Sequence, residues 1–250
     1  MKKRSYCALY LIALMVLSGL LTSGLQAAES PQREKAQQEQ TAPVGLEIST
    51  EELKEILMAG KIPVIDVRPQ KEYGISHIPG SINIFETEIE RMMELCPDKA
   101  SGPVLYCNGP YCHKTIRVAE KLSKNGCTNV KKYQHGLPLW RAFGNTAETS
   151  LSGVQYVFSS DKTAVFVDAR TQEEYSAGTV PGAVNLQASE IEAANQDGRL
   201  PYTDHGTRII VFGKSINQAR ELAQAIAPRA YWNSSYFAGT FEDLIKAGLW

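Results

Sequence analysis

The residues best suited to chemistry lie in one short stretch, from Cys107 to Lys114. Cys107 follows an apolar run of strand-forming residues, and the chain continues through Asn108, Gly109 and Pro110 towards a helix. Gly and Pro favour a tight loop, and successive backbone N–H groups in such a loop can bind an anion. The start of the helix adds partial positive charge, which favours a thiolate over a thiol. The sequence therefore predicts a nucleophilic Cys107 that is open to solvent, rather than a buried structural cysteine.

The rest of this loop is expected to bind the substrate. The candidate substrate-binding residues are Asn108, Gly109, Tyr111, Cys112, His113 and Lys114. Backbone N–H groups of residues 108–113 would form an anion cradle, and His113 and Lys114 would add positive charge beside it. Cys112 has two interpretations: a resolving thiol that pairs with Cys107 or accepts its sulfur, and a packing residue where the helix starts. Haem attachment and zinc binding are disfavoured, because the cysteine spacing is wrong for haem and only three candidate zinc ligands are close in sequence.

The elements that must position this stretch occur twice in the chain. The pattern from Asp66 to Asn83, with Arg, Glu-Tyr and Pro-Gly between them, recurs from Asp168 to Asn185 at one constant offset. A repeat of this length indicates two copies of one domain rather than a solenoid unit. The first copy has a cysteine at the strand end, whereas the second has residues 212–217 there and no cysteine. Because both copies keep the Asp-x-Arg pair, a local ion pair explains it better than catalysis does.

Strands and helices alternate in each copy, which predicts an α/β fold with a parallel sheet. A helix is expected from the Ser49 N-cap, with Glu52 completing a capping box, to Gly60. The other expected helices are 115–124 and 217–227, and the expected strands are 63–67, 104–106, 130–133, 164–167 and 208–212. Residues 144–153, rich in Thr, Ser and Gly, are predicted to link the two domains.

The N-terminus has the pattern of a secretory signal peptide, predicted over residues 1–28. Three basic residues precede the apolar run 6–21, which is shorter than the ~20 residues that span a bilayer. We therefore expect cleavage, a periplasmic location and no stable membrane insertion afterwards. Residues 29–44 are predicted to be a flexible linker. Cleavage removes only positive charge from a chain of 26 basic and 27 acidic residues, and the resulting acidic protein lacks a broad basic surface for nucleic acid.

The remaining cysteines and histidines are assigned structural roles. An exported chain can form disulfides, and Cys96 and Cys127 could pair, but Cys127 is expected to pack after its helix instead. His77 precedes Ile-Pro-Gly and is expected to be a turn residue; Thr179 replaces it in the second copy, which leaves a catalytic role open. His135 is expected to be an ordinary loop residue that could border the mouth of the Cys107 site.

Several short motifs stand in the order found in the rhodanese (sulfurtransferase) family. They are Asp-x-Arg with Glu-Tyr, then residues 77–83 (His-Ile-Pro-Gly-Ser-Ile-Asn), a strand ending in cysteine, Tyr133-x-x-Gly136 and Trp140. The chain resembles a tandem pair of such domains, over 45–145 and 150–250. The resemblance implies that each is an α/β domain around a parallel five-stranded sheet.

The resemblance also implies an activity. Cys107 would take a sulfane sulfur from thiosulfate or a similar donor, become a persulfide and pass the sulfur to a thiol or cyanide acceptor, which is covalent catalysis in two steps. No metal or organic cofactor is needed for this chemistry.

The chain departs from the family pattern at two points. The loop from Cys107 to Arg117 is longer than in compact members and lacks their arginine, and related folds with longer loops handle phosphate or arsenate. The usual catalytic half of tandem members is the C-terminal one, so the second domain here is expected to be a structural or substrate-shaping partner. Two alternatives to sulfur transfer stay open: a thiol–disulfide or oxyanion reductase using Cys107 and Cys112, and a non-catalytic sulfur-binding module.

Overall fold

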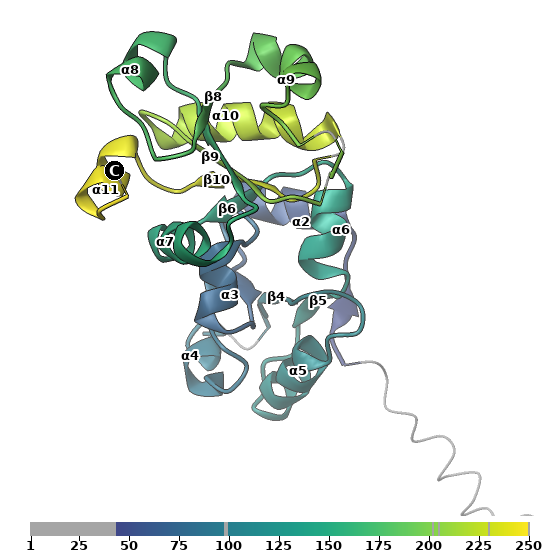
Figure 1. The fold of residues 1–250 in the computed structure, drawn as a ribbon. Helices are drawn as coiled ribbons and strands as arrows, with labels where there is room; N and C mark the ends of the chain where they lie inside the picture. Colours follow the sequence, from purple (N-terminus) through teal and green to yellow (C-terminus); the bar gives the residue numbers. More distant parts are fainter. Residues whose placement is uncertain (1–43, 98–99, 202, 205, 230, 250) are drawn as a thin grey trace, which may run out of the picture. The chain divides into compact units, whose positions relative to one another are not determined.

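Two parallel five-stranded sheets with helices packed on their faces make up the described part of the chain (Figure 1). The computed structural model describes residues 44–97, 100–201, 203–204, 206–229 and 231–249. The predicted signal peptide, 1–28, and residues 29–43 of the predicted linker lie outside the described residues. The expected α/β fold with two tandem domains is confirmed. Within the described ranges, no helix combines the length and the apolar composition needed to cross a bilayer.

The first domain has the strand order β1-β5-β4-β2-β3, and all neighbouring strands are parallel. Its strands are β1 (Leu46–Glu47), β2 (Val64–Asp66), β3 (Ile82–Asn83), β4 (Val104–Tyr106) and β5 (Lys131–Tyr133). Its helices are α2 (Thr50–Ala59), α3 (Gln70–Ile75), α4 (Ile89–Met93), α5 (Lys114–Lys124) and α6 (Gly136–Ala142). The central position of β4 explains its unbroken apolar sequence, because a central parallel strand is buried on both faces.

The second domain repeats this topology with the order β6-β10-β9-β7-β8. Its strands are β6 (Ala147–Thr149), β7 (Val165–Asp168), β8 (Val184–Asn185), β9 (Ile209–Phe212) and β10 (Ser234–Phe237). Its helices are α7 (Leu151–Ser160), α8 (Gln172–Ala177), α9 (Ile191–Asp197), α10 (Ile216–Ile226) and α11 (Phe241–Lys246), with the 3-10 turns η1 (Ala188–Glu190) and η2 (Ala227–Arg229). The predicted interdomain linker 144–153 is wrong in its extent, because it contains β6 and the start of α7.

Side chains of β4 alternate between two buried clusters of the first domain. Leu105 and Cys107 belong to the cluster that includes residues of α4 and α5. Val104 and Tyr106 belong to the cluster that includes residues of α2 and α6. This alternation follows from the two-residue period of a strand, and it sends Cys107 towards the α4 and α5 side of the sheet.

Helix α2 begins and ends where its sequence signals stand. The Ser49 hydroxyl accepts a hydrogen bond from the Glu52 amide at 3.1 Å, and Gly60 ends the helix with a φ of 62°. The Glu52 carboxylate binds the ammonium of Lys131 at 2.7 Å. The N-cap predicted at Ser49 is therefore confirmed. The predicted capping box is wrong, because the Glu52 carboxylate binds Lys131 of strand β5 instead of the Ser49 backbone amide.

The two domains meet where α3 packs on α7. A Cβ atom on Gly153 would lie 1.9 Å from the Gly74 carbonyl oxygen, so this close approach requires glycine. His77 and Glu148 exchange backbone hydrogen bonds of 3.0 and 2.9 Å in an antiparallel bridge. Backbone hydrogen bonds, and not only side-chain contacts, therefore connect the two domains.

Candidate active site at the end of strand β4

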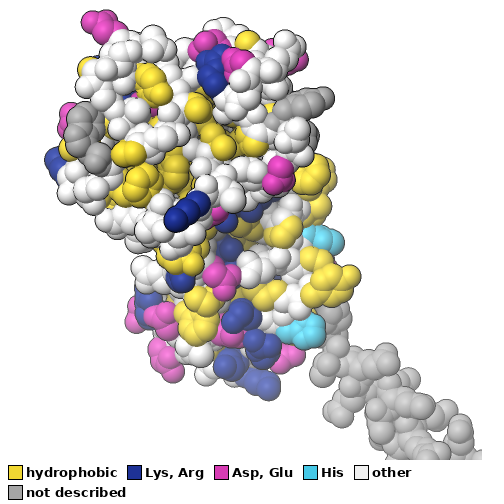
Figure 2. Space-filling view, viewed as in Figure 1, with side chains coloured by type: hydrophobic (Ala, Val, Ile, Leu, Met, Phe, Trp, Pro, Cys, Tyr) yellow, Lys and Arg dark blue, Asp and Glu magenta, His cyan; other side chains and the backbone are white. Residues whose placement is uncertain are grey.

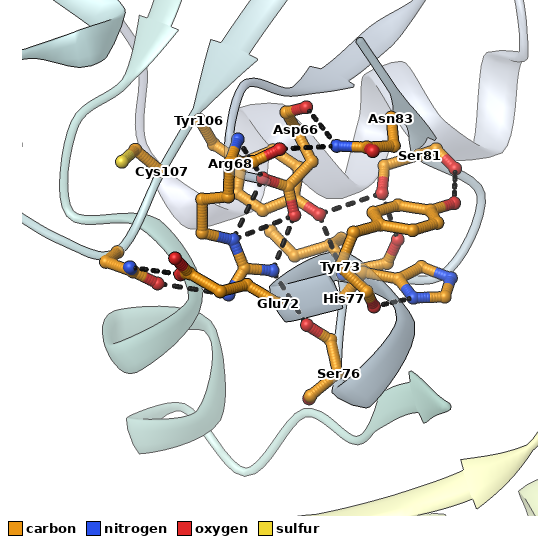
Figure 3. A network of polar contacts seen from close by, with 12 residues as sticks. Asp66, Arg68, Glu72, Tyr73, Ser76, His77, Ser81, Asn83, Tyr106 and Cys107 are labelled. Carbon is orange, nitrogen blue, oxygen red and sulfur yellow. Dashed lines mark hydrogen bonds and ion pairs between the residues drawn. The ribbon is translucent and has the colours of Figure 1, made fainter. Parts of the chain in front are cut away.

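Cys107 lies directly after β4, at the carboxyl end of the first sheet, where open parallel sheets bind their ligands. Its sulfur is bonded to that of Cys112, five residues later, and Cys107 is only 1% exposed. In Figure 3 its side chain points away from the guanidinium of Arg68. The expectation of an open thiol is therefore wrong for this oxidised form. The structure instead contains the pairing that one interpretation of Cys112 anticipated, and a free Cys107 requires reduction of the disulfide.

The loop between β4 and α5 is also held by hydrogen bonds. It turns at Gly109, whose φ of 131° lies in the region that favours glycine, and the Gly109 carbonyl accepts from the Cys112 amide at 2.9 Å. The side-chain amide of Gln134 donates to the carbonyls of Pro110 and Cys112, both at 3.1 Å. The hydroxyl of Thr115 donates in turn to the Gln134 oxygen at 2.7 Å. Gln134, which sequence reasoning missed, thus fixes the loop from a neighbouring segment.

Gly136 supports the backbone of Cys107 from the other side. Its φ is 59°, and an added Cβ atom would lie 2.1 Å from the Cys107 carbonyl oxygen. The same carbonyl accepts a hydrogen bond from the Leu137 amide at 3.3 Å. The Tyr133-x-x-Gly136 motif therefore has a physical meaning, since only glycine lets the start of α6 approach the strand end this closely.

The predicted binding residues form the loop itself and the start of α5, and their side chains have different surroundings. Asn108 is exposed and bridges two side chains, donating to Glu72 at 2.6 Å and accepting from Arg68 at 3.0 Å. Tyr111 is 94% exposed, and His113 is exposed at the N-cap of α5. The loop thus presents an amide, a phenol and an imidazole to solvent.

Lys114 is paired with an acidic residue. Its ammonium lies 2.5 Å from the Glu86 carboxylate, which also pairs with Arg117 at 2.6 Å. Burial raises the pKa of Glu86, but hydrogen bonds and charge from these two cations outweigh it and lower the pKa overall. The positive charge expected beside Cys107 is therefore partly neutralised.

Asp66 and Arg68 form the buried ion pair that the repeat predicted (Figure 3). The Asp66 carboxylate accepts from the Arg68 backbone amide at 3.0 Å and from its guanidinium. The guanidinium also donates to the carbonyl of Ser76 at 2.7 Å. Burial lowers the pKa of Arg68, but the hydrogen bond and the charge of Asp66 raise it further, and the net shift is upward. This pair joins β2 to the segment after α3 and, through Asn108, to the Cys107 loop.

The second domain keeps the ion pair without the loop. Arg170 binds Asp168 in the same way, with its guanidinium 3.4 Å from the Phe241 ring centroid. The sheet registers place Gly213 where Cys107 stands, because Asp66 faces Tyr106 and Asp168 faces Phe212. The loop before α10 spans only 213–215, against 107–113 in the first domain, and its Lys214 amide donates to Gln218 at 2.8 Å. The second domain therefore has neither the thiol nor the loop that a thiol would need.

His77 and His135, which lie outside the loop, have structural contacts. His77 is buried and stacked on Tyr73, and its two ring nitrogens face the Tyr73 carbonyl at 2.8 Å and the Glu148 carboxylate at 3.3 Å. It is thus more than the expected turn residue, because it joins the two domains. The backbone of His135 borders Gly109, while its side chain lies 3.5 Å from the Glu47 carboxylate.

A second disulfide lies on the buried side of α5. Cys96 and Cys127 are bonded across 31 residues. The expectation that Cys127 only packs after the helix is wrong. The reason is tertiary: the segment after α4 and the segment after α5 come together in one core cluster, which the sequence pattern could not show.

The face seen in Figure 2 carries both acidic and basic side chains, and several Lys and Arg side chains gather on its lower part.

Comparison with known proteins identifies the family. The family model of the rhodanese-like domain matches residues 49–143 and 157–247. The chain belongs to the rhodanese family. Each match covers four of the five strands of one sheet, with β1 and β6 just before the matched residues, which confirms the resemblance to a tandem pair.

Individual relatives match parts of this rhodanese-family chain. An HTH-type transcriptional regulator of Mycobacterium tuberculosis is 38% identical over 87 residues, which cover 34% of this chain and 37% of that protein. The thiosulfate:glutathione sulfurtransferase of Homo sapiens is 28% identical over 109 residues, covering 39% of this chain and 91% of that protein. Among solved structures, a thiosulfate sulfurtransferase from Pseudomonas aeruginosa is 18% identical with a TM-score of 0.38, covering 82% of this chain and 43% of that one. The chain thus spans well under half the length of the mycobacterial regulator.

Proposed function

We propose that this protein is an exported, periplasmic sulfurtransferase that carries a sulfane sulfur on Cys107. The donor is thiosulfate or a similar compound, and the acceptor is a thiol or cyanide. The observation that carries the proposal is the place of Cys107: it follows the central strand and begins a loop that leads to the N-terminus of the 11-residue helix α5. Membership of the rhodanese family supports sulfur transfer, and the basic and apolar N-terminal sequence supports export.

The first step must open the Cys107–Cys112 disulfide. An external dithiol gives two electrons and two protons, is itself oxidised to a disulfide, and leaves two thiols on the protein. Loss of a proton then makes Cys107 a thiolate, which the positive end of α5 and the loop amides other than that of Cys112, already bonded to Gly109, would stabilise. Reduction therefore comes before sulfur transfer, and the isolated oxidised protein should be inactive.

Sulfur transfer then proceeds in two balanced displacements. The Cys107 thiolate attacks the outer sulfur of thiosulfate, the sulfur–sulfur bond of thiosulfate breaks, and its electron pair leaves with sulfite. The acceptor next attacks the terminal sulfur of the persulfide, and the Cys107 thiolate is restored. Cyanide gives thiocyanate, and a thiolate gives a persulfide of the acceptor.

The test is thiocyanate formation from thiosulfate and cyanide by protein that has been reduced and then freed of reductant. We expect turnover by the reduced protein and none by Cys107→Ser. The matched control removes the other disulfide, with Cys96→Ser and Cys127→Ser together, and should keep the activity. If the reduced protein forms thiocyanate no faster than Cys107→Ser, the proposal is wrong.

The disulfide itself favours one alternative, a thiol–disulfide oxidoreductase in which Cys112 resolves a mixed disulfide on Cys107. The variant Cys112→Ser separates the two functions. A sulfurtransferase keeps thiocyanate formation in this variant and no longer needs prior reduction. An oxidoreductase loses its disulfide exchange, because the mixed disulfide has no internal thiol to release it.

A further inference from the structure

A pocket of about 210 Å³ lies beside the Cys107 loop and is lined by both domains. Arg68, Asn108 and Arg141 of the first domain contribute to its wall, and Arg208 of the second domain completes it. Three guanidinium groups around one small pocket are unusual in an otherwise mildly acidic chain, because like charges repel unless an anion lies between them.

Among the arginines of this pocket, Arg141 has a buried side-chain nitrogen without a hydrogen-bond partner among the described residues. One terminal nitrogen donates to the Ser76 hydroxyl, but its buried Nε has no hydrogen-bond partner among the described residues. No carboxylate of the described chain lies within ion-pair distance of it. Burial, followed by the positive charges of Arg208 and Arg68, lowers the pKa of Arg141. A buried donor without a partner costs free energy, which a bound acceptor would recover.

The other charged groups of the pocket already have partners. Arg68 is neutralised by Asp66, with 4% and 0% of their side chains exposed. The Nε of Arg208 lies 3.3 Å from the Asp161 carboxylate, and its side chain is 22% exposed. Glu72 is the acidic residue of the wall, and it accepts a hydrogen bond from Asn108. Arg141 therefore remains the cation without a counter-charge, and Arg208 is the accessible one beside it.

We propose that this pocket is an oxyanion-binding subsite that the cysteine-less domain completes with Arg208. A guanidinium presents a planar fork of donors that matches carboxylate and tetrahedral oxyanions. The ligand would be a small oxyanion group, either a free inorganic sulfur oxyanion or the carboxylate of a thiol compound. On the proposed function, the pocket would hold the charged end of donor or acceptor beside the Cys107 loop, to which Asn108 belongs. Binding itself requires no sulfur transfer, so it can be measured separately.

The test is calorimetric titration of the full-length Cys107→Ser protein at constant ionic strength. Sodium sulfate is the first probe, because it is an oxyanion that cannot donate sulfur, and glutathione is the second. We expect one saturable site for at least one probe. Arg208→Gln and Arg141→Gln should each weaken binding about tenfold or more, the scale of one hydrogen bond to a charged group. The matched control is Arg229→Gln, which removes an exposed arginine of the same domain outside the pocket and should change nothing.

The outcomes distinguish an inorganic oxyanion from a carboxylate as the ligand. They also distinguish failure of the proposed subsite from failure of the proposed sulfur transfer. Sulfate binding that depends on Arg208 identifies an inorganic oxyanion site, and glutathione binding without sulfate binding identifies a carboxylate site. Arg208→Gln decides the result if Arg141→Gln does not fold, which its thermal unfolding curve will show. The proposal is overturned if neither probe saturates, or if Arg208→Gln binds as tightly as Arg229→Gln. Anion binding without thiocyanate formation in the reduced wild type would overturn the proposed function alone.

Discussion

Replacing Asp66 by asparagine should lower the free energy of unfolding by about 3–5 kcal/mol, the cost of removing one partner of a buried ion pair. Asp66 is fully buried, and Arg68 is only 4% exposed. Asparagine keeps the shape of the side chain but removes its charge. The guanidinium would remain buried with the Ser76 carbonyl and the Asn108 side chain as neutral partners, which do not replace a carboxylate.

The second domain supplies a matched variant. Asp168→Asn removes the same carboxylate from an equally buried pair and should cost a similar free energy. The two variants should differ in function. Arg68 donates to Asn108 of the Cys107 loop at 3.0 Å, whereas Arg170 lies against Phe241. We therefore expect Asp66→Asn to slow thiocyanate formation and Asp168→Asn to leave it near the wild-type rate.

Urea unfolding followed by circular dichroism measures the stability, and thiocyanate formation after reduction measures the function. If both variants lose less than about 1 kcal/mol of unfolding free energy, these ion pairs contribute no more than exposed salt bridges do, and the argument from burial is refuted. Equal loss of activity in both variants would refute the link from Arg68 to the loop.

Three further predictions concern the frame of the site. Removing the 31-residue crosslink with Cys96→Ala and Cys127→Ala should cost up to about 4 kcal/mol in urea unfolding with sulfur transfer retained; an unchanged midpoint would contradict this. Gly136→Ala should cost more than Gly60→Ala in the same assay, because both have positive φ but only Gly136 has backbone at 2.1 Å from the new Cβ; equal losses would show that the approach is not required. Burial raises the pKa of Glu148, but hydrogen bonds from His77 across the domain contact and from Tyr236 within the second domain outweigh it and lower the pKa overall. Stability should therefore fall as the pH falls through the lowered pKa of this carboxyl, and Glu148→Gln should flatten the curve of stability against pH; parallel curves for the two proteins would be evidence against this.

Local elements could be predicted from the sequence because their causes are local. The strand 104–106 has the bounds of β4, and the Ser49 and Gly60 signals mark the ends of α2. The repeat predicted a second sheet of the same topology, and the Asp-x-Arg motif predicted its ion pair. Each of these depends on residues that are near neighbours in the chain or on a pattern repeated within it.

The remaining features depend on contacts between distant segments. The Cys96–Cys127 bond needs the segments after α4 and α5 to meet. Cys107 is buried because its side chain packs in the same core cluster as residues of α4 and α5. Arg208 reaches the pocket near Asn108 only because the two domains pack together. Neither hydrophobic periodicity nor motif spacing contains this information, so such residues could be found only in the folded chain.

The mass of the peptide that contains Cys107 tests the central claim most directly. The protein is reduced, freed of reductant, treated with thiosulfate and digested under non-reducing conditions after the thiols are blocked. The account predicts a gain of about 32 mass units, one sulfur atom, on Cys107 in the wild type and in Cys112→Ser, removed by cyanide. A Cys107 that gains no sulfur while fully reduced, or a sulfur atom found on Cys112 alone, would contradict it.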